Sequence, residues 1–160
     1  AIVTATDKNE PLVLLKITKK SPAPERLKAL TYAHSLNGQE LIIQNSSKEL
    51  LEHESIDFDI VVPQKLAQSV SAHKGNVLAK DIQMPTRLQT NSGSIEVVNA
   101  HNSIDAQVED KGSITVRNTH ARTKVQTNSG AISIYDSHHS VIAQTNQGGI
   151  ILYAKQVPST

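Results

Sequence analysis

Three histidines stand at equivalent positions in the second half of the chain. His101, His120 and His138 each follow a glycine by eight residues, and His139 adjoins the last of them. If the intervening segments fold into similar turns, the three imidazole rings lie in one row. Neutral imidazoles on adjacent turns are suitable ligands for a zinc, nickel or copper ion. The spacing therefore makes this row a candidate metal site.

The same histidine row has a simpler structural interpretation. The left-handed backbone region that tight corners need is enriched in Asn, Asp and His, and a histidine at an exposed corner is solvated. A metal-binding imidazole usually donates its other nitrogen to a carboxylate or carbonyl group, and no carboxylate is clearly placed for that. We therefore favour a corner role and expect no cofactor, with metal binding as the alternative.

Four glutamines form a second recurring set near the same glycines. The set consists of Gln89, Gln107, Gln126 and Gln144. Side-chain amides stacked at strand spacing can hydrogen-bond to one another along the row. They can also present a polar surface to sugars or to peptidoglycan. The internal ladder is the favoured interpretation, and a binding surface is the alternative.

Asparagine and aspartate also recur close to the turns. One set follows glycine by six residues and consists of Asn99, Asn118 and Asp136. Another stands near the glycine itself and consists of Asn91, Asn128 and Asn146. Side chains of this kind typically hydrogen-bond to the backbone of a turn. We therefore interpret both sets as structural.

The glycines define the repeat that positions all of these residues. Six of the seven glycines lie after residue 70. The intervals are 18, 19, 18 and 18 residues along the series Gly75, Gly93, Gly112, Gly130 and Gly148. The longer interval reflects one extra residue before Gly112. A fixed period of this size is typical of a repeat architecture.

Apolar residues alternate on both sides of each glycine. The columns after glycine contain Val77, Ile95, Ile114, Ile132 and Ile150, and Ala79, Val97, Val116, Ile134 and Leu152. The columns before glycine contain Val70, Leu88, Ala106, Val125 and Ala143, and Ala72, Thr90, Val108, Thr127 and Thr145. A period of two indicates strands with one buried face. Each repeat is therefore predicted as strand, glycine turn, strand and corner.

Strands this short bury their apolar faces only if successive repeats stack. Stacking places like residues over one another in parallel strands about 4.8 Å apart. We therefore predict an all-β parallel β-solenoid of about five coils. An antiparallel hairpin array is the alternative, but it would not require the same residue at the same offset in every copy. Calcium-binding nonapeptide repeats fit poorly, because no aspartate follows Gly148-Gly149 at the required place.

The first third of the chain lacks the glycine period but also predicts strands. Pro11 to Thr18 is apolar, Asn37-Gly38 is a hairpin signal, and Ser55 to Val62 alternates. A solenoid needs its end coils covered, because exposed strand edges recruit other chains. We predict that residues 1–64 form a β-strand cap or first irregular coils, continuous with a solenoid over residues 65–157 in one domain. We see no comparable cover for the last coil, which could contact another subunit.

Composition argues against several classes of protein. Lys plus Arg number 16 and Asp plus Glu number 15, without a basic block, so nucleic-acid binding has little electrostatic support. No apolar run approaches the ~20 residues of a membrane-spanning helix. The chain has no cysteine, which excludes disulfides and thiol chemistry.

Catalytic groups do not converge in the predicted fold. Enzymes that cleave polysaccharides need acids placed together on either side of the bond. Asp57 and Asp59 fall in the cap, and the other acids fall on different faces of the coils: Glu96, Asp105, Glu109 and Asp110. Neither a Gly-x-Ser-x-Gly elbow nor a phosphate-binding loop occurs. We therefore expect no catalytic residues and no enzyme activity.

The coil pattern resembles that of a known family. Thr-x-Ser-Gly-x-Ile-x-Val-x-Asn, with the segment Phe58-Asp-Ile-Val-Val-Pro63 leading into the coils, is similar to the bacterial adhesin-like family of unknown function. The resemblance covers nearly the whole chain, although histidine stands at corners where the family commonly has glycine. It implies a single-stranded right-handed β-helix in an exported protein that is periplasmic, secreted or at the cell surface. It implies no catalytic residues.

Fold and resemblance together predict a non-catalytic, adhesin-like protein of the cell envelope or a secreted one. Its β-helical surface would bind a protein or glycan partner. The alternative is a structural protein that assembles end to end through the open last coil. An enzyme acting on polysaccharide is a further, less favoured alternative.

Overall fold

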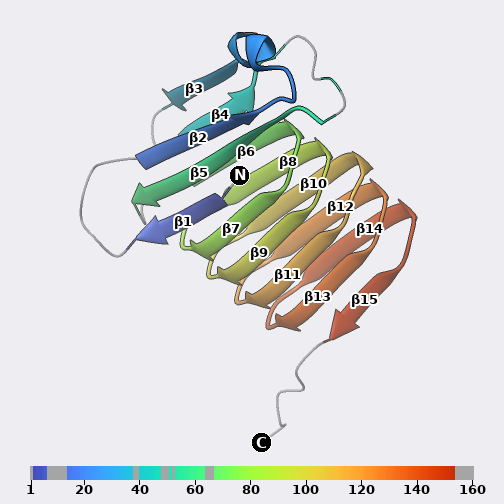
Figure 1. Cartoon of the computed structure of the whole chain (residues 1–160). Coiled ribbons are helices and arrows are strands. Elements are labelled where there is room, and N and C mark those ends of the chain that lie inside the picture. Colours follow the sequence, from blue (N-terminus) through green and yellow to red (C-terminus); the bar gives the residue numbers. More distant parts are fainter. Residues whose placement is uncertain are drawn as a thin grey trace, which may run out of the picture.

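The chain folds into a parallel β-solenoid, which confirms the predicted fold class (Figure 1). The structure is a computed structural model that describes residues 2–6, 14–37, 40–47, 51, 53–63 and 67–153. From residue 67 onward, five coils follow one another, each made of two strands. The strands of neighbouring coils pair in parallel, so the antiparallel hairpin array is excluded for this region.

The described strands belong to two sheets, and every coil contributes one strand to each. The eight-stranded sheet contains β1 (Ile2–Thr6), β2 (Leu14–Lys20), β5 (Ser55–Pro63), β7 (Val77–Ile82), β9 (Ile95–Ala100), β11 (Ile114–Thr119), β13 (Ile132–Ser137) and β15 (Ile150–Tyr153). The seven-stranded sheet contains β3 (Tyr32–Asn37), β4 (Glu40–Asn45), β6 (Ala67–Lys74), β8 (Thr86–Ser92), β10 (Ile104–Lys111), β12 (Thr123–Ser129) and β14 (Val141–Gln147).

The core consists of the predicted columns of aliphatic side chains between the two sheets. Ile114 lies opposite Ile95 on one side and Ile132 on the other, in register. All three are at most 1 % exposed. The alternation of buried and exposed residues along each strand places the intervening polar side chains on the outer faces. Stacking of like residues from coil to coil is therefore confirmed.

Glycine is required at the turn between the two strands of a coil. The turn glycines have φ values from 135° to 155° and are Gly75, Gly93, Gly112, Gly130 and Gly148. A Cβ atom on Gly112 would lie 1.8 Å from the carbonyl oxygen of Gly93 in the preceding coil. Both the backbone conformation and the close approach of successive turns therefore demand a residue without a side chain.

Threonine inside the core is explained by the same turn. Thr127 is 1 % exposed, and its hydroxyl donates to the carbonyl oxygen of Gly112 in the preceding coil at 3.0 Å. Thr90 and Thr145 make the equivalent bonds to Gly75 and Gly130. A buried hydroxyl is tolerated only when it has a partner. The recurrence of threonine three residues before glycine therefore reflects a repeated hydrogen bond.

The one long interval between glycines appears as a bulge in β10. Val108 pairs with Thr127, whereas Lys111 pairs with Ser129, so the pairing shifts by one residue between them. The same shift occurs against β8 on the other side. The extra residue leaves Glu109 and Asp110 exposed on the outer face of the seven-stranded sheet.

The first third of the chain extends both sheets. β1 pairs in parallel with both β5 and β7, and β4 pairs in parallel with β6. Two outermost strands, β2 and β3, run antiparallel to their neighbours β5 and β4. The hairpin predicted around Asn37-Gly38 is confirmed, because Asn37 pairs with Glu40; Gly38 itself is outside the described residues. The predicted strands near Pro11–Thr18 and Ser55–Val62 correspond to β2 and β5, and residues 11–13 are outside the described part.

A short 3-10 helix, η1 (Pro24–Lys28), closes this end of the solenoid (Figure 1). The helix begins at the end of the proline-containing segment Ser21–Pro24, and β3 starts after it, at Tyr32. Pro24 starts the helix with a suitable fixed φ, and Leu30 just after it is fully buried in the core. The segment before β3, with η1 and Leu30, therefore covers the first strands of the two sheets.

A buried ion pair holds the covering segment in place. The Arg26 guanidinium donates to both carboxylate oxygens of Glu54, at 2.7 and 3.1 Å. The carboxylate also accepts from the Ser21 hydroxyl and the Leu51 backbone N–H. The Arg26 hydrogen bonds, then the bond from Leu51, lower the pKa of Glu54 to about 2.

Candidate functional site

The corner between coils is built by the asparagine and aspartate column, not by histidine. Positive φ values between 52° and 59° occur six residues after glycine, at Asp81, Asn99, Asn118 and Asp136. Among the described histidines only His53 has a positive φ, so the left-handed role proposed for the histidine row is wrong. Asn and Asp adopt this conformation more readily than bulkier residues because their short polar side chains can hydrogen-bond locally.

These corner residues also bond to one another. The Asn99 amide donates to Asp81 at 2.6 Å, and the Asn118 amide donates to Asn99 at 3.1 Å. The predicted structural role for this column is therefore correct, but the side chains form a ladder between coils. A shorter part of the same kind of ladder joins Asn146 to Asn128 at 2.9 Å.

The histidine row stacks as its spacing predicted. The ring centroids of His101 and His120 are 5.1 Å apart, and those of His120 and His138 are 4.5 Å apart. The ring planes differ by 8° and 12°. The backbone N–H of each residue donates to a carbonyl of the preceding coil, which fixes the row at the corner. Desolvation, followed by repulsion from His138 and His101, lowers the pKa of His120.

This stack does not have the geometry of a metal site. Imidazole binds a metal through a nitrogen lone pair in the ring plane, and nearly parallel planes do not converge on a point between the rings. In the described part of the chain, no group of three or more His, Asp or Glu side chains is placed to hold a metal ion. Metal binding by the row stays a prediction, and the stacking does not favour it.

The glutamine row crosses the outer face of the seven-stranded sheet in register. Gln107 pairs with Gln89 and Gln126, and Gln126 pairs with Gln144. Gln89 donates to Glu109 of the bulge. Among the described residues, however, no hydrogen bond joins one of these glutamines to another. The predicted internal amide ladder is therefore absent from the row, and amides of Gln107 and Gln126 face outward.

A pocket of about 240 Å³ lies beside the central glutamines. Gln107 and Gln126 form one side, and Glu109, Asn128 and Asn146 contribute further polar groups. The pocket adjoins the bulge in β10, because Val108 and Glu109 are among the residues that line it. The sequence predicted the glutamines but not the depression next to them.

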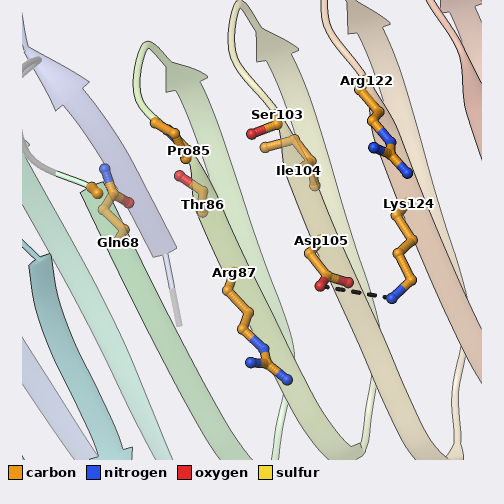
Figure 2. A pocket seen from close by; sticks show the side chains of 10 residues that line it. Gln68, Pro85, Thr86, Arg87, Ser103, Ile104, Asp105, Arg122 and Lys124 are labelled. Atoms are coloured by element: carbon orange, nitrogen blue, oxygen red, sulfur yellow. Dashed lines mark ion pairs between the residues drawn. The ribbon is translucent and has the colours of Figure 1, made fainter.

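A second pocket, of about 370 Å³, lies where the strands of the same sheet begin (Figure 2). We call it the basic pocket and define it by Gln68, Arg87, Asp105, Arg122 and Lys124. Register places Arg87, Asp105 and Lys124 side by side on β8, β10 and β12. Lys124 Nζ lies 4.0 Å from Asp105 Oδ2, and both side chains are about half exposed.

Arg122 joins the basic pocket from the corner before β12. The Ile104 N–H donates to the Arg122 carbonyl at 3.0 Å, which continues the backbone ladder through the corner. Three cationic side chains against one carboxylate leave an excess of two positive charges (three minus one) in the pocket. Only Lys124 among the three cations is paired within the described residues.

Gln68 lines the same pocket from the inner side of β6 (Figure 2). The residue is 4 % exposed, and among the described residues no donor reaches its Oε1 atom. Two threonines of the same inward column, Thr86 and Thr123, do find hydrogen-bond acceptors. An unsatisfied buried acceptor is costly, of the order of 1–3 kcal/mol. Gln68 is therefore an exception to the satisfied hydrogen bonding of this column, and a ligand that donates to its Oε1 atom would explain it.

The residues of the basic pocket do not repeat from coil to coil, so the period of the sequence does not reveal them. The outward row at the pocket reads Ser69, Arg87, Asp105, Lys124 and Ile142, which share neither type nor charge. The available signal was positional, since each of these residues precedes a glutamine-row position, or its equivalent Ser71, by two. Asp105 had been considered only as an isolated acid. Asp57 and Asp59, the acids assigned to the cap, lie in β5 outside the residues whose side chains are described.

Comparison with known proteins adds no further constraint. No protein-family model, no curated protein and no solved structure matches the chain. The resemblance to the adhesin-like family therefore stays a prediction.

Proposed function

We propose that this chain is a non-catalytic binding protein of the bacterial envelope, or a secreted one, and that the outer face of its seven-stranded sheet binds a glycan or protein partner. The proposal combines the resemblance to the adhesin-like family with the chemistry of this face. Export follows from that resemblance and is part of the proposal. No helix in the described residues is long and apolar enough to cross a membrane.

The observation that carries the proposal is the register of polar rows on one face. The glutamine row, the row of Arg87, Asp105 and Lys124, and the pocket beside the glutamines lie on the outer side of the same sheet. The basic pocket opens on this side where the strands begin and reaches inward as far as Gln68. Parallel strands repeat every ~4.8 Å, so equivalent amides recur at that spacing. Within the described part of the chain, the side-chain amides of Gln107 and Gln126 have no internal hydrogen-bond partner, and they face outward. A surface of this kind suits a chain-like ligand with repeated hydroxyl or amide groups.

The acids of the coils support a non-catalytic role. Glu96 lies 3.8 Å from Arg117 on the eight-stranded sheet, whereas Asp105 lies near Lys124 on the other sheet. Glu109 accepts from Gln89, and Asp110 accepts from Ser92. Each of these four carboxylates therefore has its own local partner. A glycoside hydrolase instead needs two carboxyl groups that face each other across one bond.

A binding experiment with a matched control tests the proposal. Purified peptidoglycan and a glycan array are incubated with the wild type and with the double variant Gln107→Ala/Gln126→Ala. The control is Thr115→Ala/Ser133→Ala, which removes two paired polar side chains from the outer face of the opposite sheet. We expect binding that the glutamine variant weakens and the control preserves. Equal loss in both variants, or release of reducing ends from the polymer, would contradict the proposal.

The alternative, end-to-end assembly, has one specific observation in its favour. The last coil exposes apolar side chains to between 46 % and 59 %, namely Ile142, Ile150, Ile151, Leu152 and Tyr153. Light scattering across a range of protein concentrations separates the two functions. A mass that rises with concentration and returns to the monomer value in Leu152→Lys supports assembly, and a constant monomer mass opposes it.

A further inference from the structure

We propose that the basic pocket binds one acidic sugar unit, with its oxyanion on the arginine and lysine side chains and a sugar hydroxyl on Gln68. The inference rests on the proposed function, because the pocket lies on the face assigned to the partner. It goes further by naming the chemical class of ligand and the residues that distinguish it from a neutral sugar.

The cationic side chains account for the oxyanion. Arg87 and Arg122 approach the pocket from β8 and from the corner before β12, and Lys124 extends from β12 toward Asp105 (Figure 2). Guanidinium groups present paired N–H donors that match the two oxygens of a carboxylate or phosphate. Asp105 offsets one of the three positive charges, so the remaining excess favours a ligand with one or two negative charges.

The acceptors of the pocket account for the sugar. Among the described residues, Gln68 Oε1 is buried without a donor, and the Asp105 carboxylate has only an ion pair with Lys124, at 4.0 Å, and no hydrogen bond. A fully ionised inorganic anion brings acceptors but no donor for these atoms. Sugar hydroxyls supply donors on the same molecule that carries the oxyanion. The pocket therefore combines cations that bind an anion with acceptors that bind hydroxyl groups. An acidic sugar carries both the anion and the hydroxyl groups.

The size of the pocket and its lining agree with a single sugar unit. A volume of about 370 Å³ is at the small end of the range for small-molecule sites, ~300–1,000 Å³. None of the described residues that line it is aromatic, whereas single-stranded nucleic acids are usually held by bases stacked on aromatic rings. The adjacent glutamine row would then contact the neighbouring units of a longer chain.

The test compares ligands that differ only in charge. An oligomer of galacturonic acid and its methyl ester have the same sugar scaffold, but the ester lacks the carboxylate. Calorimetry with the wild-type protein should show at least about tenfold tighter binding of the acid, because each charge-assisted hydrogen bond contributes enough for that ratio. Binding of the acid should also weaken as salt is added, since the cations are exposed. Glucose 6-phosphate, set against glucose, tells whether the preferred oxyanion is a phosphate.

Variants locate the binding in the pocket. Arg87→Gln/Arg122→Gln should weaken binding of the acidic oligomer at least about tenfold and leave binding of the ester unchanged. Arg117→Gln is the matched control, because Arg117 is a half-exposed cation on the opposite sheet. Gln68→Met should weaken the sugar without lowering the melting temperature, since it removes an acceptor that has no partner. A lower melting temperature with unchanged affinity would show Gln68 to be purely structural and would overturn its assigned role.

The remaining outcomes separate this inference from the proposed function. Equal affinity for acid and ester, equal loss in Arg117→Gln, or equally tight binding of a single-stranded oligonucleotide would overturn the acidic-sugar inference. If polymer binding still depends on Gln107 and Gln126 in those cases, the proposed function stands. If neither the acids, the sugar phosphates nor any polymer binds, both proposals fall.

Discussion

The strands at the two ends of the solenoid are similar, but those at the N-terminal end are covered and those at the C-terminal end are exposed. At the N-terminal end, β2, β3 and η1 lie over the first layers, and Leu30 and Ile43 are fully buried. At the other end, β14 and β15 are the outermost of the described strands in their sheets. Ile132 is fully buried, whereas Ile150, its neighbour in the same column, is 47 % exposed. The residue type and the register are the same. The difference is that β13 has a described strand on each side, whereas β15 has one only on the β13 side.

This comparison shows that burial in the solenoid is a property of the stack. A single coil is too thin to enclose its own aliphatic side chains, so each coil is completed by its neighbours on both sides. The covered end replaces the missing neighbour with antiparallel strands and a helix. The stability of any residue should therefore depend on its place along the stack as much as on its type.

Replacing a glycine by alanine should give the largest difference in the free energy of unfolding between positions inside the stack and at its end. Gly112→Ala places a Cβ atom against the Gly93 carbonyl at a positive φ. Overpacking and the strained backbone together should lower the free energy of unfolding by about 3–5 kcal/mol. In Gly149→Ala the new Cβ meets no atom within 4 Å, so the change should be within about 0.5 kcal/mol. Urea unfolding followed by circular dichroism measures both, and similar losses would refute the stacking explanation.

Truncation of the isoleucine column tests the comparison directly. Ile114→Ala removes a fully buried side chain between two coils and should cost about 2–5 kcal/mol. Ile150→Ala removes the same atoms from the open end, where they are half exposed, and should cost less than about 1 kcal/mol. The same unfolding measurement applies. A loss at Ile150 as large as that at Ile114 would mean that the last coil is covered in solution.

These columns were predictable because the period of the sequence matches the period of the structure. Alternation indicated the inward residues, and the glycine spacing aligned Ile95, Ile114 and Ile132. The left-handed corner was assigned to histidine instead of Asn99 and its equivalents, because composition alone does not show which corner residue reverses the chain. The stack of rings, in contrast, followed directly from the spacing.

The remaining features depend on contacts that local patterns do not specify. Insertion of β1 between β5 and β7 joins segments far apart in sequence, and alternation in Ile2–Thr6 is compatible with many neighbours. The basic pocket likewise arises where Gln68, Arg87 and Arg122, from three different coils, line the same depression at the start of the strands. Because these residues do not repeat, the period that revealed the core gave no signal for the site.

The ion pair at the covered end should make that end sensitive to acid. The pKa of Glu54 is about 2 in the folded protein and 4.5 for an unperturbed glutamate. Its carboxylate therefore stabilises the fold fully above pH 4.5, and this contribution is lost as pH falls toward 2. Glu54→Gln should be less stable than the wild type at pH 7 and should lose less stability on acidification. Urea midpoints at pH 7 and pH 3 measure this, and equal pH dependence in both proteins would contradict it.

The smallest expected effect lies in the histidine row, where His120 has a ring on each side just as Ile114 has an isoleucine on each side. The pKa of His120 is lowered in the folded protein, so the unfolded chain binds more protons as pH falls through the ordinary value of 6.5. Stability should therefore decline modestly from pH 7.5 to pH 5.5, and His120→Asn should reduce that decline. His73→Asn is the control, because His73 lies on the other sheet and bonds to Asn91. If the two variants show the same pH dependence of the urea midpoint, position within the stack does not determine the titration of His120.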